Sequence, residues 1–322
     1  MVDSFSLDGG KMPGINMRVS PRKIRSLISH QERTSVDVRL LSQIELNIVR
    51  SEAYTKLTSN HGASMSTQNE TRLRSVLEDT TVELSLWLEE WIVIVSTESV
   101  PSQRAVGLQN LNIQYQWALM TLHLKAIATT GIENIALMTE FQHDCVRKAK
   151  NAAAQHLQHV LEASTSPSTS PLHPEAAQRS SYLSSFRWTL DYVWAKCAFS
   201  VLLVLKLAIL LRDPIPSVML LLRDAHRLLE ELKRVTVGHI AYFQILQTSI
   251  EKCEAALHEY VPQQHAAAGV DLASPGTARS AEDEFQGYVP SEFIFEWDFP
   301  GLNLKHMPLG WQDFFIDIEN LF

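Results

Sequence analysis

The stretch SVDVRLLSQIELNIVRSEAYTKL, residues 35–57, places its apolar residues at the spacing of an α-helix. Spacings of three or four residues recur among them, as from Val38 to Leu41 and from Val49 to Ala53: Val38, Leu41, Ile44, Leu46, Ile48, Val49, Ala53 and Leu57. Such a face is buried against other helices in folded proteins. Thr34 or Ser35 fits the N-cap, because a hydroxyl oxygen there accepts a hydrogen bond from the first turn. The stretch therefore predicts an amphipathic helix that ends near the polar residues 59–64.

The same period recurs along most of the chain. We expect six further helices, over residues 67–92, about 104–129, about 132–163, 185–211, about 216–235 and about 239–260. Thr67 and Glu70 have the spacing of a capping box, Pro101 ends the second run, and Gly131 separates the third helix from the fourth. Glycine is sparse, with 12 residues in 322. The sequence thus predicts an all-α fold, a multi-helix bundle of about seven main helices.

Composition limits the class of protein further. At 45% apolar and 20% charged residues, the chain lies in the ordinary globular range. Cys145, Cys197 and Cys253 are too far apart for a CxxC metal site or a local disulfide framework, which favours a reducing, intracellular compartment. The N-terminus lacks the apolar core of a signal peptide. We therefore expect a protein that is not secreted.

Residues 185–211, SFRWTLDYVWAKCAFSVLLVLKLAILL, are the most apolar part of the chain. Asp191, Lys196 and Lys206 interrupt the run, whereas a membrane span needs about 20 predominantly apolar residues. We predict a central helix that is buried on most sides and does not cross a membrane, with Cys197 as a small hydrophobic residue in it. Three aromatic residues of the run suit either the core or a small effector pocket: Trp188, Tyr192 and Trp194.

Composition also suggests how the chain is divided. We expect a flexible segment over 1–33, a helical domain over 34–261 with a Ser/Thr/Pro linker at 164–174, a second linker over 262–281, and an acidic aromatic segment over 282–322. Three serines in the linkers precede proline and are candidate phosphorylation sites, although a plain flexible connection explains them too: Ser166, Ser170 and Ser274. The basic cluster PRKIR, residues 21–25, fits either a nuclear import signal or the solvated start of a helix.

Common catalytic and metal signatures are missing from the sequence. It contains no GxGxxG, GxxxxGK[ST], GxSxG or HExxH pattern. His156 and His159 are three residues apart, but a structural metal site needs about four ligands, so we expect them on a solvated helix surface. We predict a protein that is not an enzyme and has no catalytic, metal or cofactor-binding residue.

The segment FIFEWDFPGLNLKHMPLGWQDFF, residues 293–315, combines bulky aromatic residues with carboxylates. Residues 282–322 hold nine carboxylates and one lysine, so they account for the whole net charge of −8 and residues 1–281 are formally neutral. Without a basic excess, the chain alone should bind DNA weakly. The segment supplies the candidate partner-contact residues: Trp297, Phe299, Trp311, Phe314, Phe315, Ile318 and Phe322. The last five share one side of a predicted terminal helix, whereas residues 289–304 fit equally well an extended strap packed on the body.

Four blocks together resemble the C-terminal regulatory half of fungal zinc-binuclear-cluster transcription factors. They are SSFRWTLDYVWAKCAFSVLLVLKLAILL, AYFQILQTSIEKCEAAL, VPSEFIFEWDFPGLNLKHMPLGWQDFFIDIE and the earlier RLLSQIELNIVRSEAY. The resemblance covers roughly residues 35–322. It implies an all-helical regulatory region followed by a segment that contacts coactivators, in a protein of the nucleus, with the cytoplasm as a second location.

The chain departs from that family at one decisive point. The resemblance implies a DNA-binding module in which six cysteines hold two zinc ions, and three scattered cysteines cannot form it. We therefore expect a transcription regulator without its own zinc cluster, whose partners are the transcription machinery or a full-length related regulator. Two alternatives stay open: a truncated, inactive or dominant-negative remnant that sequesters partners, and a helical small-molecule-binding protein.

Overall fold

Helices account for nearly all of the chain that the computed structural model describes, namely residues 21–30, 32–58, 67–127, 138–162, 191–211, 213–235, 246, 247, 250, 251, 254 and 255. Within these ranges there are seven α-helices and no β-strand: α2 (Pro21–Ile28), α3 (Ser35–Thr58), α4 (Thr67–Ser96), α5 (Pro101–Ala126), α6 (Glu140–Glu162), α7 (Asp191–Leu210) and α8 (Ile215–Val235). The predicted all-α class is confirmed. The predicted acidic aromatic extension, 282–322, and the linkers at 164–174 and 262–281 lie outside the described residues.

The predicted helix over residues 35–57 is confirmed as α3, and Thr34 is its N-cap. The Thr34 hydroxyl accepts a hydrogen bond from the backbone N–H of Asp37 at 3.3 Å, and the Asp37 carboxylate accepts one from the Thr34 N–H at 2.8 Å. This reciprocal pair is a capping box. The hydrogen bonds from Thr34 lower the pKa of Asp37, because they favour the carboxylate.

The start of the fourth predicted helix was wrong by eight residues. We expected it near residue 132, but α6 begins at Glu140, and Met138 and Thr139 are not helical. Thr139 and Gln142 explain the boundary, because the Gln142 side chain accepts from the Thr139 N–H at 2.9 Å and the Thr139 hydroxyl accepts from the Gln142 N–H at 3.3 Å. The signature Thr-x-x-Gln in the sequence already marks this capping box.

The third predicted helix also begins elsewhere than expected. It starts at Pro101, three residues earlier than the predicted position, while the preceding α4 ends at Ser96. Proline is favoured at the first helical position, because its missing N–H would have no partner there and its fixed φ suits the helix. Pro101 thus begins α5 rather than simply ending α4.

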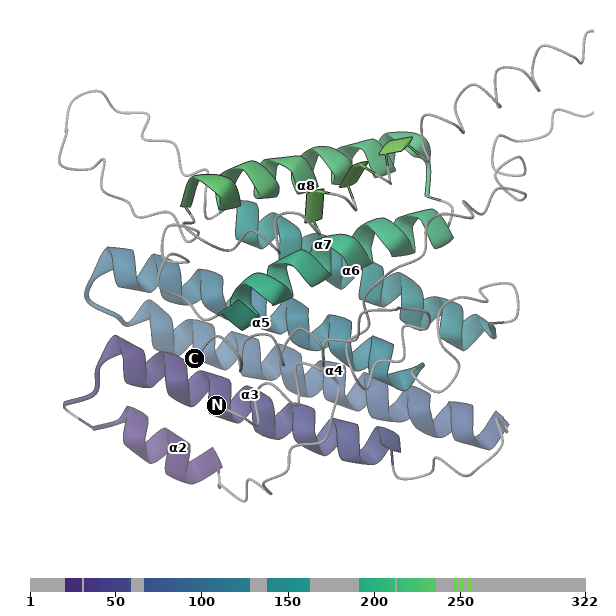
Figure 1. The fold of residues 1–322 in the computed structure, drawn as a ribbon. Helices are drawn as coiled ribbons and strands as arrows, with labels where there is room; N and C mark the ends of the chain where they lie inside the picture. Colours follow the sequence, from purple (N-terminus) through teal and green to yellow (C-terminus); the bar gives the residue numbers. More distant parts are fainter. Residues whose placement is uncertain are drawn as a thin grey trace, which may run out of the picture. The chain divides into compact units, whose positions relative to one another are not determined.

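Helices α3 to α6 run antiparallel to their neighbours in sequence and lie side by side (Figure 1). Between α5 and α6, Gln116 bonds to Gln155 at 2.7 Å, and Gln109, nearer the start of α5, bonds to the His159 carbonyl, nearer the end of α6. Helix α5 contacts α3, α4 and α6. It is therefore the central helix of this group, a role that the sequence did not single out.

Helix α2 occupies part of the segment that we expected to be flexible. Residues 21–28 are helical and contact α3, and the Ile28 side chain is buried. The Arg33 guanidinium donates to the Ile28 carbonyl at 2.9 Å and so closes the end of α2. The helix start that the PRKIR cluster favoured is confirmed as α2, whereas the flexible segment predicted over 1–33 stays a prediction.

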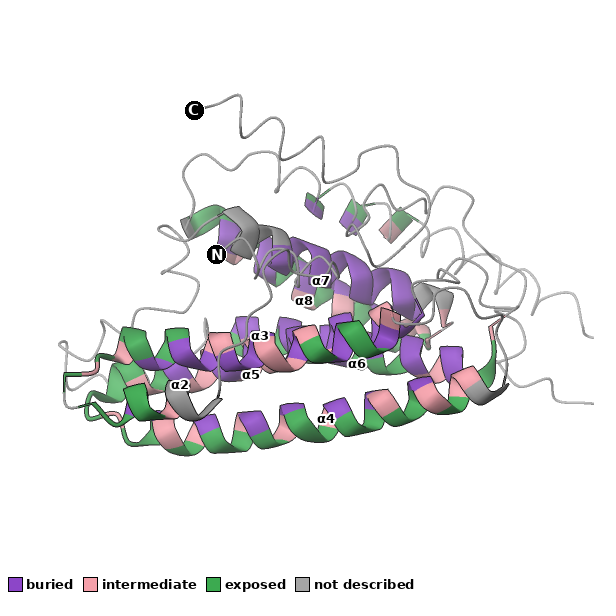
Figure 2. Ribbon diagram, turned by 90° about the horizontal axis from the view of Figure 1, so that it is seen from below, coloured by how far each residue is buried: buried purple, intermediate pink, exposed green. Residues whose placement is uncertain are grey.

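The chain divides into two compact units, one with α2 to α6 and the other with α7 and α8. The domain boundaries predicted from the sequence, with a helical domain over 34–261, stay a prediction. In the second unit, every side chain described from Lys196 to Ala208 of α7 is buried, as predicted for this apolar run (Figure 2). Of the helix predicted over 239–260, the described residues are helical, and Glu254 lies 2.6 Å from the Nε2 atom of His226 on α8. No helix within the described ranges is long and apolar enough to span a membrane.

Candidate interaction surface

The partner-contact and phosphorylation residues predicted from the sequence all lie outside the described residues. They are Trp297, Phe299, Trp311, Phe314, Phe315, Ile318, Phe322, Ser166, Ser170 and Ser274. The aromatic residues proposed for an effector pocket cannot be placed either. Trp188 lies outside the described residues, and the side chains of Tyr192 and Trp194 are not described. These assignments stay predictions.

The histidine pair on α6 does not form the solvated surface that we predicted. The His156 side chain is buried, with its ring centroid 5.7 Å from that of Trp117 on α5. His159 is partly exposed and its Nδ1 atom lies 3.5 Å from Glu162. The prediction was wrong for His156 because α6 turns this position toward the aromatic core. Within the described ranges, no three His, Cys, Asp or Glu side chains are grouped to hold a metal ion.

The two cysteines that the structure describes, Cys145 and Cys197, are buried free thiols. Burial raises the pKa of Cys145 and of Cys197 to about 12, since a thiolate would lose its hydration there. A thiol with such a pKa is a poor nucleophile near neutral pH. Cys197 therefore lies in α7 as the small hydrophobic residue that the sequence predicted.

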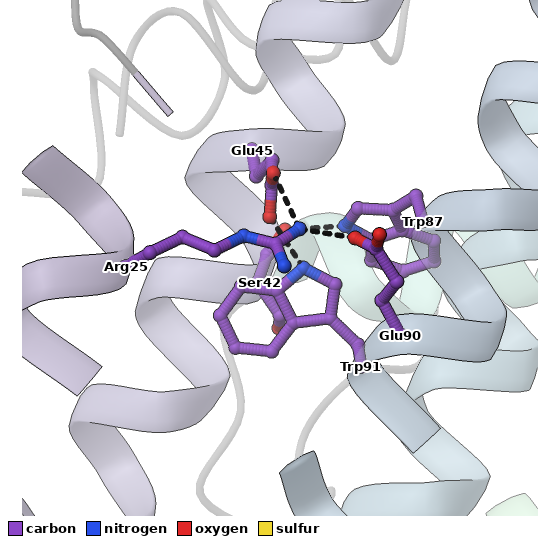
Figure 3. A network of polar contacts seen from close by, with 6 residues as sticks. All are labelled: Arg25, Ser42, Glu45, Trp87, Glu90 and Trp91. Atoms are coloured by element: carbon purple, nitrogen blue, oxygen red, sulfur yellow. Dashed lines mark hydrogen bonds and ion pairs between the residues drawn. The ribbon is translucent and has the colours of Figure 1, made fainter. Parts of the chain in front are cut away.

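A polar network joins α2, α3 and α4 at one corner of the first unit (Figure 3). It consists of Arg25, Ser42, Glu45, Trp87, Glu90 and Trp91. The Glu45 carboxylate accepts from the Trp91 indole at 2.6 Å and pairs with the Arg25 guanidinium at 3.0 Å, while the Trp87 indole donates to the Ser42 carbonyl at 3.1 Å. Arg25 also pairs with Glu90, and this hydrogen bond raises the pKa of the guanidinium.

The network fixes how α4 is turned about its own axis. Trp87 and Trp91 are buried and donate hydrogen bonds to α3. Leu84, on the same side of α4, is buried too. Positions half a turn away must then face solvent, because successive residues are about 100° apart around a helix. Figure 2 shows this division, with buried residues along one side of α4 and exposed residues along the other.

The solvent side of α4 nevertheless carries large apolar residues. Val82, Leu86 and Val93 are 58%, 52% and 67% exposed, and their spacings of four and seven residues place them on one side of the helix. We call this stripe, together with the nearby Glu78, Glu83 and Glu89, the α4 face. Glu89 lies between Leu86 and Val93 on this side of the helix. Exposed apolar side chains that share one side of a helix are candidates for protein-protein contact.

The charge around the stripe has one sign. Between Ser75 and Ser96, α4 carries five carboxylates and no lysine or arginine: Glu78, Asp79, Glu83, Glu89 and Glu90. Glu90 pairs with Arg25. Glu78, Glu83 and Glu89 are exposed and form no ion pair with any residue that the structure describes. The α4 face thus combines three exposed apolar side chains with exposed carboxylates, of which Glu89 lies between Leu86 and Val93.

Our reading of the sequence missed this surface. The helix predicted over residues 67–92 rested on the apolar positions Leu73, Leu77, Leu84, Leu88 and Ile92, and the prediction did not consider Val82, Leu86 or Val93. A helix that is apolar on more than one face is either buried all round or has a partner, and this is the signal that could have found the α4 face. The choice between those two outcomes depends on the tertiary packing of α4.

Comparisons with known proteins add no relative from which the surface could be identified: the chain matches no protein-family model, no curated protein and no solved structure.

Proposed function

We propose that this chain is a helical regulatory module that acts in transcription, in the nucleus, through contacts with other proteins and without reading DNA itself. The α4 face carries the part of the proposal that concerns protein contacts, because it exposes three large apolar side chains on a well-packed helix. The resemblance of four sequence blocks to fungal transcription regulators supports the part that concerns transcription. The proposed partners are the transcription machinery or a related full-length regulator.

The proposed role in activation belongs to residues 282–322. Carboxylates that repel one another keep a chain solvated, so that its aromatic side chains stay accessible to a shallow groove on a coactivator. Trp297 and Phe314 are the aromatic residues chosen to represent this segment. No catalytic step and no cofactor enter the proposal.

A reporter assay tests this role with the full chain fused to a heterologous DNA-binding domain. We expect transcription above that of the DNA-binding domain alone, and we expect Trp297→Ala combined with Phe314→Ala to reduce it to background. Phe285→Ala combined with Tyr288→Ala is the matched control, since these aromatic residues come from the same acidic segment but are not among the predicted contacts. A fusion that gives no activation contradicts the activating role.

Direct DNA binding is tested separately by a gel shift over a range of salt concentrations. Residues 1–281 are formally neutral and the remaining segment is acidic, so few phosphate charges can be neutralised. We expect weak binding that disappears as salt is raised. Tight, sequence-specific binding by this chain alone would contradict the proposal that it acts without reading DNA.

A further inference from the structure

We propose that the α4 face binds a cationic amphipathic helix of a partner protein. The inference rests on the proposed function, in which the chain acts through protein contacts, and it names the chemistry of one partner. Such a helix would place leucine-like side chains on Val82, Leu86 and Val93 and its lysines or arginines beside the carboxylates that flank them.

The geometry of the stripe sets the size of the partner element. From Val82 to Val93 the helix rises by about 16 Å, at about 1.5 Å per residue. An apolar stripe of this length matches about three turns of a second helix packed along it. A helix packed along α4 could contact all three apolar side chains and place a cationic side chain opposite Glu89, between Leu86 and Val93.

The charges around the stripe select the sign of the partner. Glu78 and Glu83 lie beside the apolar residues and Glu89 lies between Leu86 and Val93, and none of the three has a counter-charge from any described residue. Lysines or arginines that flank the apolar face of a partner helix would pair with them, whereas an acidic helix or a nucleic acid would be repelled. Charge complementarity therefore favours a basic helix as the occupant.

The chain itself contains one example of this contact chemistry. Helix α2 begins with the basic cluster PRKIR, and its Arg25 pairs with Glu90 at the edge of α4 and with Glu45 on α3. A guanidinium from a short basic helix is thus already bound at one edge of this surface. Glu90 is the neighbour of Glu89 in α4, and the three carboxylates and three apolar side chains of the α4 face are all exposed.

The probe is a labelled synthetic peptide of about 18 residues, long enough for a helix to form on contact, with leucines on one face and lysines and arginines on the other. Its binding to the full chain is measured by fluorescence anisotropy. The control peptides have glutamate in place of every lysine and arginine, or the same composition in scrambled order. We expect binding of the cationic amphipathic peptide alone, with an affinity that falls as NaCl screens the charges.

Variants of the chain locate the binding site. Leu86→Gln combined with Val93→Gln, and separately Glu83→Lys combined with Glu89→Lys, should each weaken binding by about tenfold or more, because they remove the apolar contacts or reverse the charge. Met219→Gln on α8 and Glu52→Lys on α3 are matched controls. Met219 is 54% exposed and Glu52 is also exposed, and neither belongs to α4. Circular dichroism and thermal unfolding show whether each variant keeps its fold.

Three results would overturn the inference: no binding of the cationic peptide, equal binding of the acidic or scrambled peptide, or unchanged affinity in both folded variants. In the reporter assay, the loss of activation caused by Trp297→Ala combined with Phe314→Ala reports on residues 282–322 and leaves the α4 face unchanged. A failed peptide experiment with a positive reporter result therefore rejects this partner and leaves the proposed function, whereas the reverse pattern rejects activation and leaves the surface.

Discussion

Helices α4 and α5 are both apolar on more than one side, yet they occupy different environments. In α5, residues from Leu111 to Ala126 are buried or half-buried on all sides, because α3, α4 and α6 surround the helix. In α4, Trp87 and Trp91 face the core while Val82, Leu86 and Val93 face solvent. The comparison shows that apolar composition alone does not tell whether a face is core or contact surface. Only the position of the neighbouring helices separates the two cases.

The largest effects should follow truncation of the buried leucines. Leu124→Ala on α5 and Leu84→Ala on the inner side of α4 remove side chains that are both fully buried. Each should lower the free energy of unfolding by about 2–5 kcal/mol, since the lost burial and the cavity both contribute. Urea unfolding followed by circular dichroism measures the change. If Leu84→Ala cost less than about 0.5 kcal/mol, the assignment of this side of α4 to the core would be wrong.

Acidification should also lower the free energy of unfolding, through His123 on α5. Burial lowers the pKa of His123 to about 4. The charge of Lys148 is a second, smaller cause of this shift, and the charge of Asp144 opposes it. Because the unfolded state takes up a proton near pH 6.5 and the folded state only near pH 4, stability is complete above pH 6.5 and falls between these values. The full difference corresponds to about 3 kcal/mol.

Substitution of the histidine isolates its share of this pH dependence. We expect the free energy of unfolding of His123→Leu to change less between pH 7 and pH 4.5 than that of the unsubstituted chain. Carboxylates titrate in both proteins, so the difference between the two pH profiles belongs to His123. Identical profiles would mean that the imidazole can take up its proton in the folded state.

The close approach of α4 to α5 at Gly107 predicts a smaller loss of stability when this glycine is replaced by alanine. Gly107 on α5 lies against Val95 on α4, and a Cβ at position 107 would be 2.8 Å from the Val95 Cγ1 atom. Alanine favours a helix over glycine by about 1 kcal/mol, but overpacking a buried contact costs about 1–3 kcal/mol, and the β-branched valine has little rotamer freedom. We expect Gly107→Ala to destabilise the chain by about 1 kcal/mol in thermal unfolding.

A double variant distinguishes this contact from a general effect of alanine. Val95→Ala removes the methyl group that the new Cβ would meet. The combination of Val95→Ala and Gly107→Ala should therefore be more stable than the sum of the two single changes predicts. Additive changes would show that the two side chains do not collide.

The sequence predicted where the helices lie along the chain better than which helices become neighbours and which of their faces are buried. The 3.6-residue period located α3, α4, α7 and α8 closely, because that signal is local. The start of α6 was misplaced although its capping box, Thr139 and Gln142, is written in the sequence. The burial of His156, the central place of α5 and the exposed stripe of α4 depend on which helices become neighbours. No pattern within one helix contains that information.

The smallest effects should come from the α4 face, and they decide what this surface is. Leu86→Ala makes the same chemical change as Leu84→Ala two residues away, but Leu86 is 52% exposed. We expect the free energy of unfolding to change by no more than about 0.5 kcal/mol, because a side chain that is about half solvated already loses little burial.

The triple change of Val82, Leu86 and Val93 to glutamine should likewise leave the urea midpoint nearly unchanged while abolishing peptide binding. A loss of about 2 kcal/mol or more from Leu86→Ala would instead mean that another part of the chain covers this stripe in the folded protein, because only a buried leucine contributes that much. The α4 face would then be core like α5, and its apolar residues would no longer call for a partner.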